Sequence, residues 1–276
     1  MSGSTPSEPD VTVVIPALNE AGNIGRLVDE TYAAMAADRL AGVIVVDDAS
    51  TDTTADEVGS RIAGGRMPGL RLIRHTHRCG QSAALRTGIL AAATPLIAQM
   101  DGDGQNDPAD LPKLLALIAA PGTPGPSLIG GVRTDRQAEG SKRLASKAAN
   151  AIRSAVLRDN CPDTGCGIKI YQRDVFLRLP FFTSLHRYLP AFFQTYGQEV
   201  AYVPVNDRKR AAGVSKYSNT VRAIVGLFDL FGVSWLRHRS RMPEIASDHA
   251  AGASEPAAAA PRRPARDVRA AHEQQA

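Results

Sequence analysis

Short apolar runs that stop at acidic or amide side chains recur through the N-terminal part of the chain, and they strongly restrict the possible folds. Residues 11–15 lead through Pro16 and Leu18 to Asn19 and Glu20, residues 43–46 stop at Asp47 and Asp48, and residues 95–100 stop at Asp101. Helical stretches separate these runs, at about residues 22–37, 53–62 and 81–93. Apolar strands that alternate with helices of this length predict an α/β fold with a mostly parallel sheet flanked by helices.

The polar side chains at the ends of these runs are predicted to converge. In an open α/β sheet the carboxyl ends of the parallel strands share one edge, and ligands bind there. We therefore expect one edge to carry Asn19, Glu20, Asp47, Asp48, Asp101 and Asp103. A plainer interpretation stays open, in which Asp48, Ser50 and Asp52 cap the helix that follows them.

Residues 99–108 carry the oxygen donors of a candidate metal site. Asp101 and Asp103 leave an apolar run one residue apart, and the carboxamide of Gln105 follows two positions later. The glycines between them allow a turn tight enough to bring these side chains together, and oxygen donors of this kind suit Mg²⁺ or Mn²⁺. A calcium loop of EF-hand type is excluded, because its glycine and its terminal glutamate are absent. A polar strand-end turn with capping aspartates remains the alternative.

Two common phosphate-binding signatures are absent from the sequence. There is no Gly-x-x-x-x-Gly-Lys-Ser/Thr motif, and no Gly-x-Gly-x-x-Gly follows the first apolar run. Phosphates bound at this edge would therefore lack a glycine-rich backbone cradle. A divalent metal on Asp101 and Asp103 would neutralise them instead.

Several segments, taken in order, resemble the motifs of a known enzyme family. Residues 13–20, 45–50, 80–85 and 100–105 resemble the successive motifs of family-2 glycosyltransferases with the GT-A fold. Residues 131–133, 163–167 and 210–217 resemble the polyprenyl-phosphate glycosyltransferases, the branch that includes dolichyl-phosphate mannose synthase. The likeness runs from about Val11 to Tyr217 and implies a Rossmann-like GT-A domain.

The resemblance implies a metal-dependent, inverting transfer of a sugar from a nucleotide diphosphate-sugar to a polyprenyl phosphate. The donor would contact Pro16, Leu18, Asn19, Glu20, Asp47, Asp48 and Asp101, and the metal would be held by Asp101, Asp103 and Gln105. A lipid phosphate is already anionic, so it needs a cationic clamp and no strong general base. The candidates for this clamp are Arg133, Arg143, Ser146, Arg210 and Lys216, with Lys142 as the competitor of Arg143.

Other partners and functions can be weighed from the same residues. A family-2 transferase that acts on a sugar or protein hydroxyl would need a general base, for which Asp163 is the candidate. A non-catalytic nucleotide-sugar-binding subunit of a membrane complex is a further alternative, although intact Asp101 and Asp103 argue against it. Nucleic acid is the weakest candidate partner, and we expect none, because no aromatic platform alternates with the basic clusters.

The apolar segment 223–236 is predicted to form an amphipathic helix on a membrane surface. Its 14 residues end in Trp235 and Leu236 and are followed by Arg237 and Arg239, whereas crossing a bilayer takes about 20 residues. Such a helix suits an interface with anionic lipid, with residues 181–182 and 190–193 as a second apolar contact. In the alternative, the helix packs onto the domain as core. A separate transmembrane chain could supply a firmer anchor.

The chain is expected to divide into four parts. These are a disordered lead-in (1–10), a GT-A catalytic domain (11–222), a membrane-interface helix (223–241) and a disordered tail rich in Ala, Pro and Arg (242–276). Three cysteines without a signal peptide indicate a reducing compartment. We therefore expect a cytoplasmic protein that is peripheral on the inner face of the cell membrane.

Overall fold

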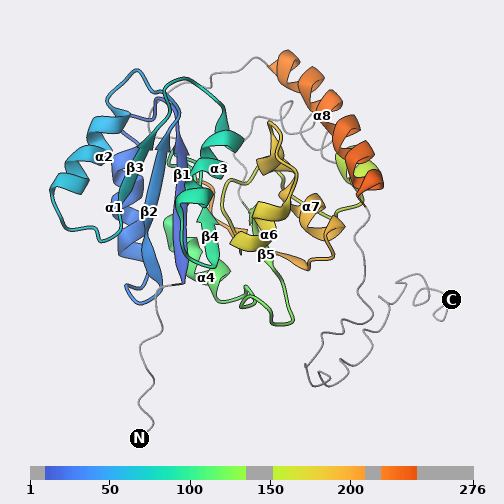
Figure 1. Cartoon of the computed structure of the whole chain (residues 1–276), viewed down its shortest axis with the longest axis horizontal. Helices are drawn as coiled ribbons and strands as arrows, with labels where there is room; N and C mark the ends of the chain where they lie inside the picture. The colour runs from blue at the N-terminus through green and yellow to red at the C-terminus, as the bar shows by residue number, and fades with distance from the viewer. Residues whose placement is uncertain (1–9, 135–151, 209–218, 241–276) are drawn as a thin grey trace, which may run out of the picture. The chain divides into compact units, whose positions relative to one another are not determined.

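The computed structural model describes residues 10–134, 152–208 and 219–240, with side chains from residue 226 onward in the last range. Within these residues lies a seven-stranded sheet with the order β3-β2-β1-β4-β6-β5-β7 (Figure 1). The strands are β1 (Val11–Ala17), β2 (Leu40–Asp47), β3 (Arg71–Arg74), β4 (Leu96–Gln99), β5 (Leu128–Arg133), β6 (Lys169–Gln172) and β7 (Val200–Val205). The predicted mostly parallel sheet is confirmed, and only β6 runs antiparallel to its neighbours, β4 and β5.

The three predicted helical stretches are present in the N-terminal half. They form α1 (Ile24–Ala34), α2 (Thr54–Ala63) and α3 (Gln81–Ala91). The later helices are α4 (Leu111–Leu115), α6 (Arg173–Arg178), α7 (Leu189–Thr195) and α8 (Asn219–Arg239), with 3-10 helices at Pro108–Asp110 and Leu185–Arg187. Residues 152–157 are helical as well.

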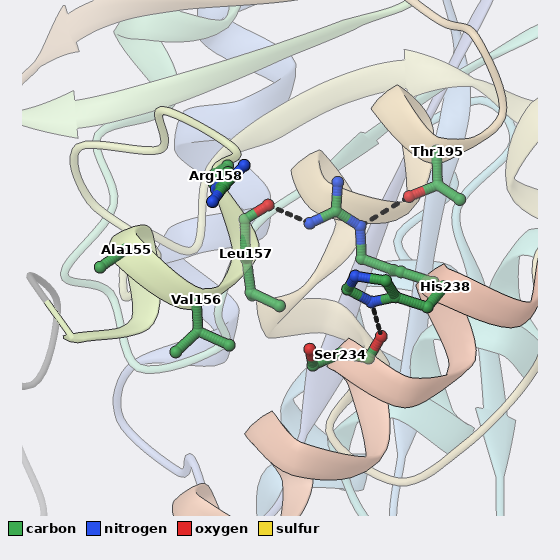
Figure 2. A pocket seen from close by; sticks show the side chains of 8 residues that line it. Ala155, Val156, Leu157, Arg158, Thr195, Ser234 and His238 are labelled. Atoms are coloured by element: carbon green, nitrogen blue, oxygen red, sulfur yellow. Dashed lines mark hydrogen bonds between the residues drawn. The ribbon is translucent and has the colours of Figure 1, made fainter.

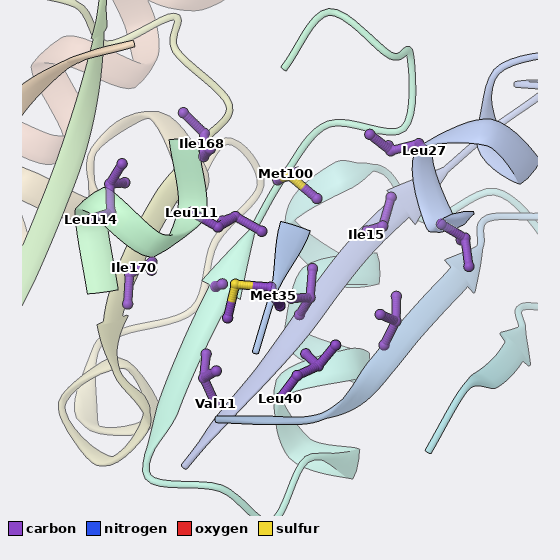
Figure 3. Packing of buried hydrophobic residues seen from close by; sticks show 14 of the residues in the cluster. Val11, Ile15, Leu27, Met35, Leu40, Met100, Leu111, Leu114, Ile168 and Ile170 are labelled. Atoms are coloured by element: carbon purple, nitrogen blue, oxygen red, sulfur yellow. The ribbon is translucent and has the colours of Figure 1, made fainter. Parts of the chain in front are cut away.

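Apolar side chains on the two faces of the sheet form two cores. Successive residues of a strand point to opposite faces, so Val13 and Ile15 of β1 join one core while Val14 joins the other. The first core packs the sheet against α1, α2 and α4 (Figure 3). The second packs it against α3, α6, α7 and part of α8. Both faces of β1 are covered, and its sequence is accordingly apolar at every position except the buried Thr12, which is hydrogen-bonded to Thr94.

Helix α8 has one buried and one exposed apolar side. Leu230 and Val233 are 8% and 3% exposed and belong to the second core. The opposite side, here named the apolar ridge, consists of Leu227, Phe228, Phe231 and Trp235, which are 62%, 76%, 76% and 60% exposed. The helix therefore packs onto the domain through one side, as the alternative interpretation required, and leaves an apolar surface on the other. No helix among the described residues combines the length and the apolar character needed to cross a bilayer.

The structure bears on two predictions for the periphery of the domain, the second apolar contact and the N-terminal lead-in. The second apolar contact predicted at residues 190–193 is wrong, because Phe192 and Phe193 are fully buried in the second core. Phe181 remains 47% exposed. Asp10, assigned to the lead-in, forms an ion pair with Arg39 at 2.8 Å. The rest of the lead-in and the tail lie outside the described residues, so those predictions stay predictions.

Candidate active site

One edge of the sheet collects the polar segments. The carboxyl ends of β1, β2, β4, β5 and β7 meet there, and the reversed direction of β6 brings its amino end to the same edge. The segments at this edge are residues 18–20, 47–48, 101–105, 133–134, 163–168 and 206–208. Strand β6 pairs with β4 on one side and β5 on the other. It thus links the donor segments predicted after β1, β2 and β4 to the acceptor segments predicted after β5 and β7.

The loops after β1 and β2 are tied together by side-chain hydrogen bonds. The Asn19 N–H donates to Ser50 Oγ at 2.9 Å, and the Glu20 N–H donates to Thr54 Oγ1 at 2.8 Å. Asn19 has a φ of 50°, a left-handed conformation that asparagine tolerates better than most residues. These contacts fix the segment 16–20, which was predicted to bind base and ribose, against the neighbouring loop.

Asp47 and Asp48 have carboxylates that are buried and hydrogen-bonded within the protein. Asp47 accepts from its own loop and from β3. Asp48 accepts from the N–H groups of Cys79 and Gly80 at 2.8 and 2.7 Å, and its Oδ1 lies 2.8 Å from Nδ1 of His75. Burial raises the pKa of Asp48, but these hydrogen bonds together lower it by more than burial raises it. The pKa of Asp48 is therefore below its usual value. Both carboxylates therefore position the loops that border the site.

A second group of potential metal ligands surrounds Asp48. Ligand atoms of Asp48, His75 and Cys79 all lie within 4.8 Å of one another. Nε2 of His75 lies 2.9 Å from Thr87 Oγ1, which orients the ring. Both oxygens of Asp48 accept hydrogen bonds from this region of the chain. In this structure the three residues therefore hold the loop before α3 in place.

Asp101 and Asp103, the predicted metal ligands, lie in a hydrogen-bonded turn after β4. Asp101 Oδ1 accepts from Gln81 Nε2 at 2.7 Å, and the Asp101 N–H donates to Asn106 Oδ1 at 2.9 Å. The Gln105 N–H donates to Asp103 Oδ1 at 3.1 Å. Burial, and then the charge of Asp103, raise the pKa of Asp101 to about 6. A divalent cation would relieve the repulsion between these carboxylates, so the residues fit the metal predicted from the sequence.

Two glycines allow the backbone to close around this turn. A Cβ on Gly167 would lie 2.4 Å from Asp101 Oδ2, and a Cβ on Gly102 would lie 2.9 Å from the Pro16 carbonyl oxygen. The segment before β6 and the strand β1 thus approach the turn at distances that exclude a side chain. Lys169, which is 3% exposed at the start of β6, partly offsets the rise in the pKa of Asp101 through its positive charge.

Asp163, the candidate general base, forms an ion pair with Arg133. Nε and Nη2 of Arg133 donate to the two carboxylate oxygens of Asp163 at 2.7 and 2.9 Å. The side chains are 15% and 11% exposed. Burial lowers the pKa of Arg133, but Asp163 raises it more, so the arginine stays firmly cationic. The Gly165 N–H also donates to Asp163, at 3.1 Å, so Asp163 fixes the orientation of Arg133 at the edge.

The end of β7 is anchored beside the acidic turn. The Asn206 N–H donates to Asp110 Oδ2 at 2.8 Å, and the Arg208 N–H donates to the Gln105 carbonyl oxygen at 2.9 Å. Nη2 of Arg208 donates to Asp107 Oδ1 at 2.6 Å. The remaining predicted clamp residues lie outside the described residues: Arg143, Ser146, Arg210 and Lys216.

Several residues that shape the site were missed by sequence reasoning. They are Gln81, Asn106, Asp107, Asp110 and Lys169. Gln81 lies in one of the recognised motifs, and this was the one signal available for it. Asn106 lies in the acidic segment 99–108 itself, where its contact with the Asp101 N–H is local. Asp107 and Asp110 contact the end of β7, and Lys169 lies at the start of β6, so segments remote in sequence bring these residues to the site.

The sequence matches one protein family over most of its length. The model of the family described as Glycosyl transferase family 2 matches residues 12–179. Dodecaprenyl-phosphate galacturonate synthase of Rhizobium johnstonii is 32% identical over 84% of this chain and 69% of its own length. Undecaprenyl-phosphate 4-deoxy-4-formamido-L-arabinose transferase of Pectobacterium carotovorum is 28% identical over 76% of this chain and 63% of its own length. The chain thus spans about two thirds of these curated relatives.

Solved structures agree on the fold. Glucosyl-3-phosphoglycerate synthase from Mycobacterium tuberculosis, in complex with Mn²⁺, UDP and glucosyl-3-phosphoglycerate, superposes with a TM-score of 0.62. The two sequences are 19% identical over 86% of this chain and 85% of the other, so the likeness establishes the GT-A fold alone. Together with the family match, it confirms the resemblance that the motifs indicated: the chain belongs to glycosyl transferase family 2.

Proposed function

We propose that the chain transfers a sugar from a nucleotide diphosphate-sugar to a polyprenyl phosphate, with inversion at the anomeric carbon and with Mg²⁺ or Mn²⁺ as cofactor. The names of the curated relatives support this acceptor class, since they specify dodecaprenyl and undecaprenyl phosphate. The observation that carries the proposal is the shared sheet edge, where the acidic turn at Asp101 and the cationic pair at Arg133 are both found.

The donor would lie over the carboxyl ends of β1, β2 and β4. Asp101, Asp103 and Gln105 would hold the metal, and the Mn²⁺ and UDP bound by the mycobacterial enzyme support a divalent metal in this fold. When bound, the metal supplies positive charge to the diphosphate. Asp47 and Asp48 keep the bordering loops in place, and residues 16–20 would contact the base and ribose.

The acceptor phosphate would lie at the Arg133 side of the edge. One of its oxygens attacks the anomeric carbon while the bond from that carbon to the diphosphate breaks, and the electron pair leaves with the nucleoside diphosphate. The attacking oxygen is already anionic, so no proton has to be removed. Asp163 engages Nε and Nη2 of Arg133, and Nη1 of the same fork would bind a phosphate oxygen. Arg143, Ser146, Arg210 and Lys216 would complete the clamp.

The Arg133–Asp163 pair also bears on the rival function. Transfer to a hydroxyl would require a general base, and Asp163 was the candidate. Both of its oxygens accept hydrogen bonds from the partly buried Arg133, which favours a positioning role for Asp163 and hence a phosphate acceptor. The non-catalytic alternative is disfavoured by the intact acidic turn.

The apolar ridge of α8 supports a peripheral position on the inner face of the cell membrane. Its exposed leucine, phenylalanines and tryptophan are followed by Arg237 and Arg239, and this combination suits an interface with anionic lipid. A separate transmembrane chain has no support in the comparisons, and the proposal does not require one.

The acceptor assignment is tested by supplying the purified chain with Mn²⁺, undecaprenyl phosphate and a panel of radiolabelled nucleotide-sugars. We expect one class of donor to place label in the organic phase, and Asp103→Ala to abolish it. Label found only in water-soluble acceptors would establish the hydroxyl-transfer alternative. Donor binding without transfer to either acceptor would identify a binding subunit.

A further inference from the structure

A pocket of about 500 Å³ lies where three helical segments meet, and the proposed reaction does not account for it. Its walls come from residues 155–158, from Thr195 of α7, and from Ser234, Arg237 and His238 of α8 (Figure 2). Volumes of this size are typical of small-molecule sites. None of the predicted donor, metal or acceptor residues lines it.

The pocket is basic. Nε of Arg237 donates to Thr195 Oγ1 at 2.6 Å, and its Nη1 donates to the Leu157 carbonyl oxygen. Both acceptors are uncharged, and among the described residues no carboxylate forms an ion pair with Arg237 or with the exposed Arg158. His238 adds a third basic group, whose Nδ1 lies 2.8 Å from the Ser234 carbonyl oxygen.

The carboxylate nearest in sequence is already engaged elsewhere. Asp159 is fully buried and accepts from Nη2 of Arg153 at 3.0 Å. Its attraction does not outweigh the effect of burial on Arg237, whose pKa is lowered. An anion would stabilise a cation in this position, and no carboxylate of the described residues forms an ion pair with Arg237.

Exposed apolar side chains border the pocket. Val156, which lines it, is 44% exposed, and Ile152 one turn earlier is 55% exposed. On the other side, Trp235 of the apolar ridge follows the lining residue Ser234 directly. A ligand that matches both features has an anionic group for the pocket and an apolar body beside it.

We infer that this pocket binds the phosphate group of an anionic membrane phospholipid, with the apolar ridge inserted into the same leaflet. The inference rests on the proposed membrane position and adds a defined headgroup site to it. Arg158 precedes Asp163 by five positions, so their Cα atoms are at most about 18 Å apart. A lipid held in the pocket keeps the Arg133–Asp163 pair near the membrane surface, to which the phosphate of a polyprenyl acceptor is confined.

Vesicle binding of the full chain tests the site, and Trp235, the one tryptophan in the sequence, reports it. With phosphatidylcholine vesicles that contain phosphatidylglycerol, we expect tight binding and a blue shift of the Trp235 emission. Arg158→Gln should weaken binding about tenfold or more, because a charge-assisted hydrogen bond is lost. The matched control is Arg239→Gln, an exposed arginine at the end of α8 outside the pocket. It should weaken binding about fivefold or less, as a diffuse surface charge does.

The possible outcomes distinguish the proposed headgroup site from the proposed membrane position, on which it rests. Equal losses for Arg158→Gln and Arg239→Gln would overturn the pocket while leaving peripheral binding intact. If the Trp235 emission of the wild-type chain does not shift on anionic vesicles, the proposed membrane position itself is wrong. Dihexanoyl-phosphatidylglycerol should compete with vesicles, and inorganic phosphate at the same concentration should not. Equal competition by both would assign the pocket to free phosphate instead of lipid.

Discussion

Asp101 is subject to two opposing requirements. As a metal ligand it has to be ionised, yet burial and the neighbouring Asp103 raise its pKa to about 6. A carboxyl group whose folded pKa lies above its unfolded value favours the folded state while it is protonated. Its contribution is therefore complete below the unfolded value of about 4 and is lost as the pH rises through about 6. At neutral pH the metal-free fold is thus destabilised by the residue that we propose as a metal ligand.

Asp101→Asn should be inactive and yet more stable than the wild type in EDTA at neutral pH. The gain in the free energy of unfolding should be up to about 3 kcal/mol, as a pKa shift of about two units implies, and it should vanish near pH 4. Urea unfolding at a series of pH values measures it. Equal stability of the two proteins at neutral pH would show that Asp101 does not destabilise the metal-free fold.

Asp103→Ala should reduce transfer about a hundredfold or more, because the second carboxylate of the metal turn is lost. Its unfolding free energy should change by less than about 1 kcal/mol, since the side chain is partly exposed in a strand-end turn. EDTA should inactivate the wild type, and Mn²⁺ or Mg²⁺ should restore it. Asp38→Ala, which removes an exposed carboxylate elsewhere, is the control. Full activity of the Asp103 variant would exclude the metal assignment.

Substitutions in the Arg133–Asp163 pair should affect the acceptor more than the donor. Arg133→Lys should raise the KM for polyprenyl phosphate about tenfold or more, because an ammonium group replaces a planar fork. Asp163→Asn should have a smaller effect of the same kind, and its pH–rate profile should keep its shape, since Asp163 positions Arg133. Loss of the acidic limb from that profile, where activity falls as the carboxylate is protonated, would instead identify Asp163 as a general base.

At the residue scale, the sequence predicted which residues lie at the edge of the sheet, but not the contacts that hold them there. Asp101 and Asp103 could be predicted because a glycine-spaced acidic pair after an apolar run is a local pattern, visible without knowledge of the fold. The buried positions of Asp47 and Asp48 and the pairing of Asp163 with Arg133 could not, because they depend on loops that approach one another only in the fold.

Helix α8 has one side that packs on the domain and another that we propose to contact the membrane. Its period places Leu230 and Val233 against the second core and the apolar ridge on the other side. Since both sides are apolar, the sequence could not decide between membrane surface and core. The apolar composition of α8 alone therefore did not show which of its side chains are buried and which are exposed.

Two neighbouring substitutions separate these functions. Leu230→Ala should lower the free energy of unfolding by about 2 kcal/mol, because a buried leucine leaves a cavity, with little effect on vesicle binding. Phe231→Ala should change stability by less than about 0.5 kcal/mol and weaken vesicle binding, because a residue 76% exposed loses only its contact with lipid. Chemical unfolding and flotation with vesicles measure the two effects. The reverse pattern would mean that the ridge is buried in the protein.

Strand β6 is one of four strands, with β3, β5 and β7, that the sequence analysis did not predict. The parallel strands before it are separated by helices of sufficient length, which predicts their direction. The sequence analysis assigned no strand or helix to residues 134–168, between β5 and β6, so it did not specify whether the next strand is parallel or antiparallel. Its direction follows from pairing with β4 and β5 at once.

For the molecule as a whole, the proposed membrane attachment has an electrostatic and an apolar component. We expect the chain to sediment with anionic vesicles at low salt and to be largely released by high salt, because screening removes the attraction of the exposed arginines. Sedimentation at increasing salt concentrations measures this. Retention that only detergent reverses would point to deeper insertion or to an integral membrane partner.

The Arg133–Asp163 ion pair has a further consequence for protein engineering. It joins two positions 30 residues apart in the chain, one at the end of β5 and the other shortly before β6. The pair therefore holds together the two ends of a segment that includes Arg143 and Ser146, two of the proposed acceptor residues. Exchanging residues 134–162 between family members, with both residues of the pair retained, would test whether this segment determines the acceptor preference while the donor-binding half is unchanged.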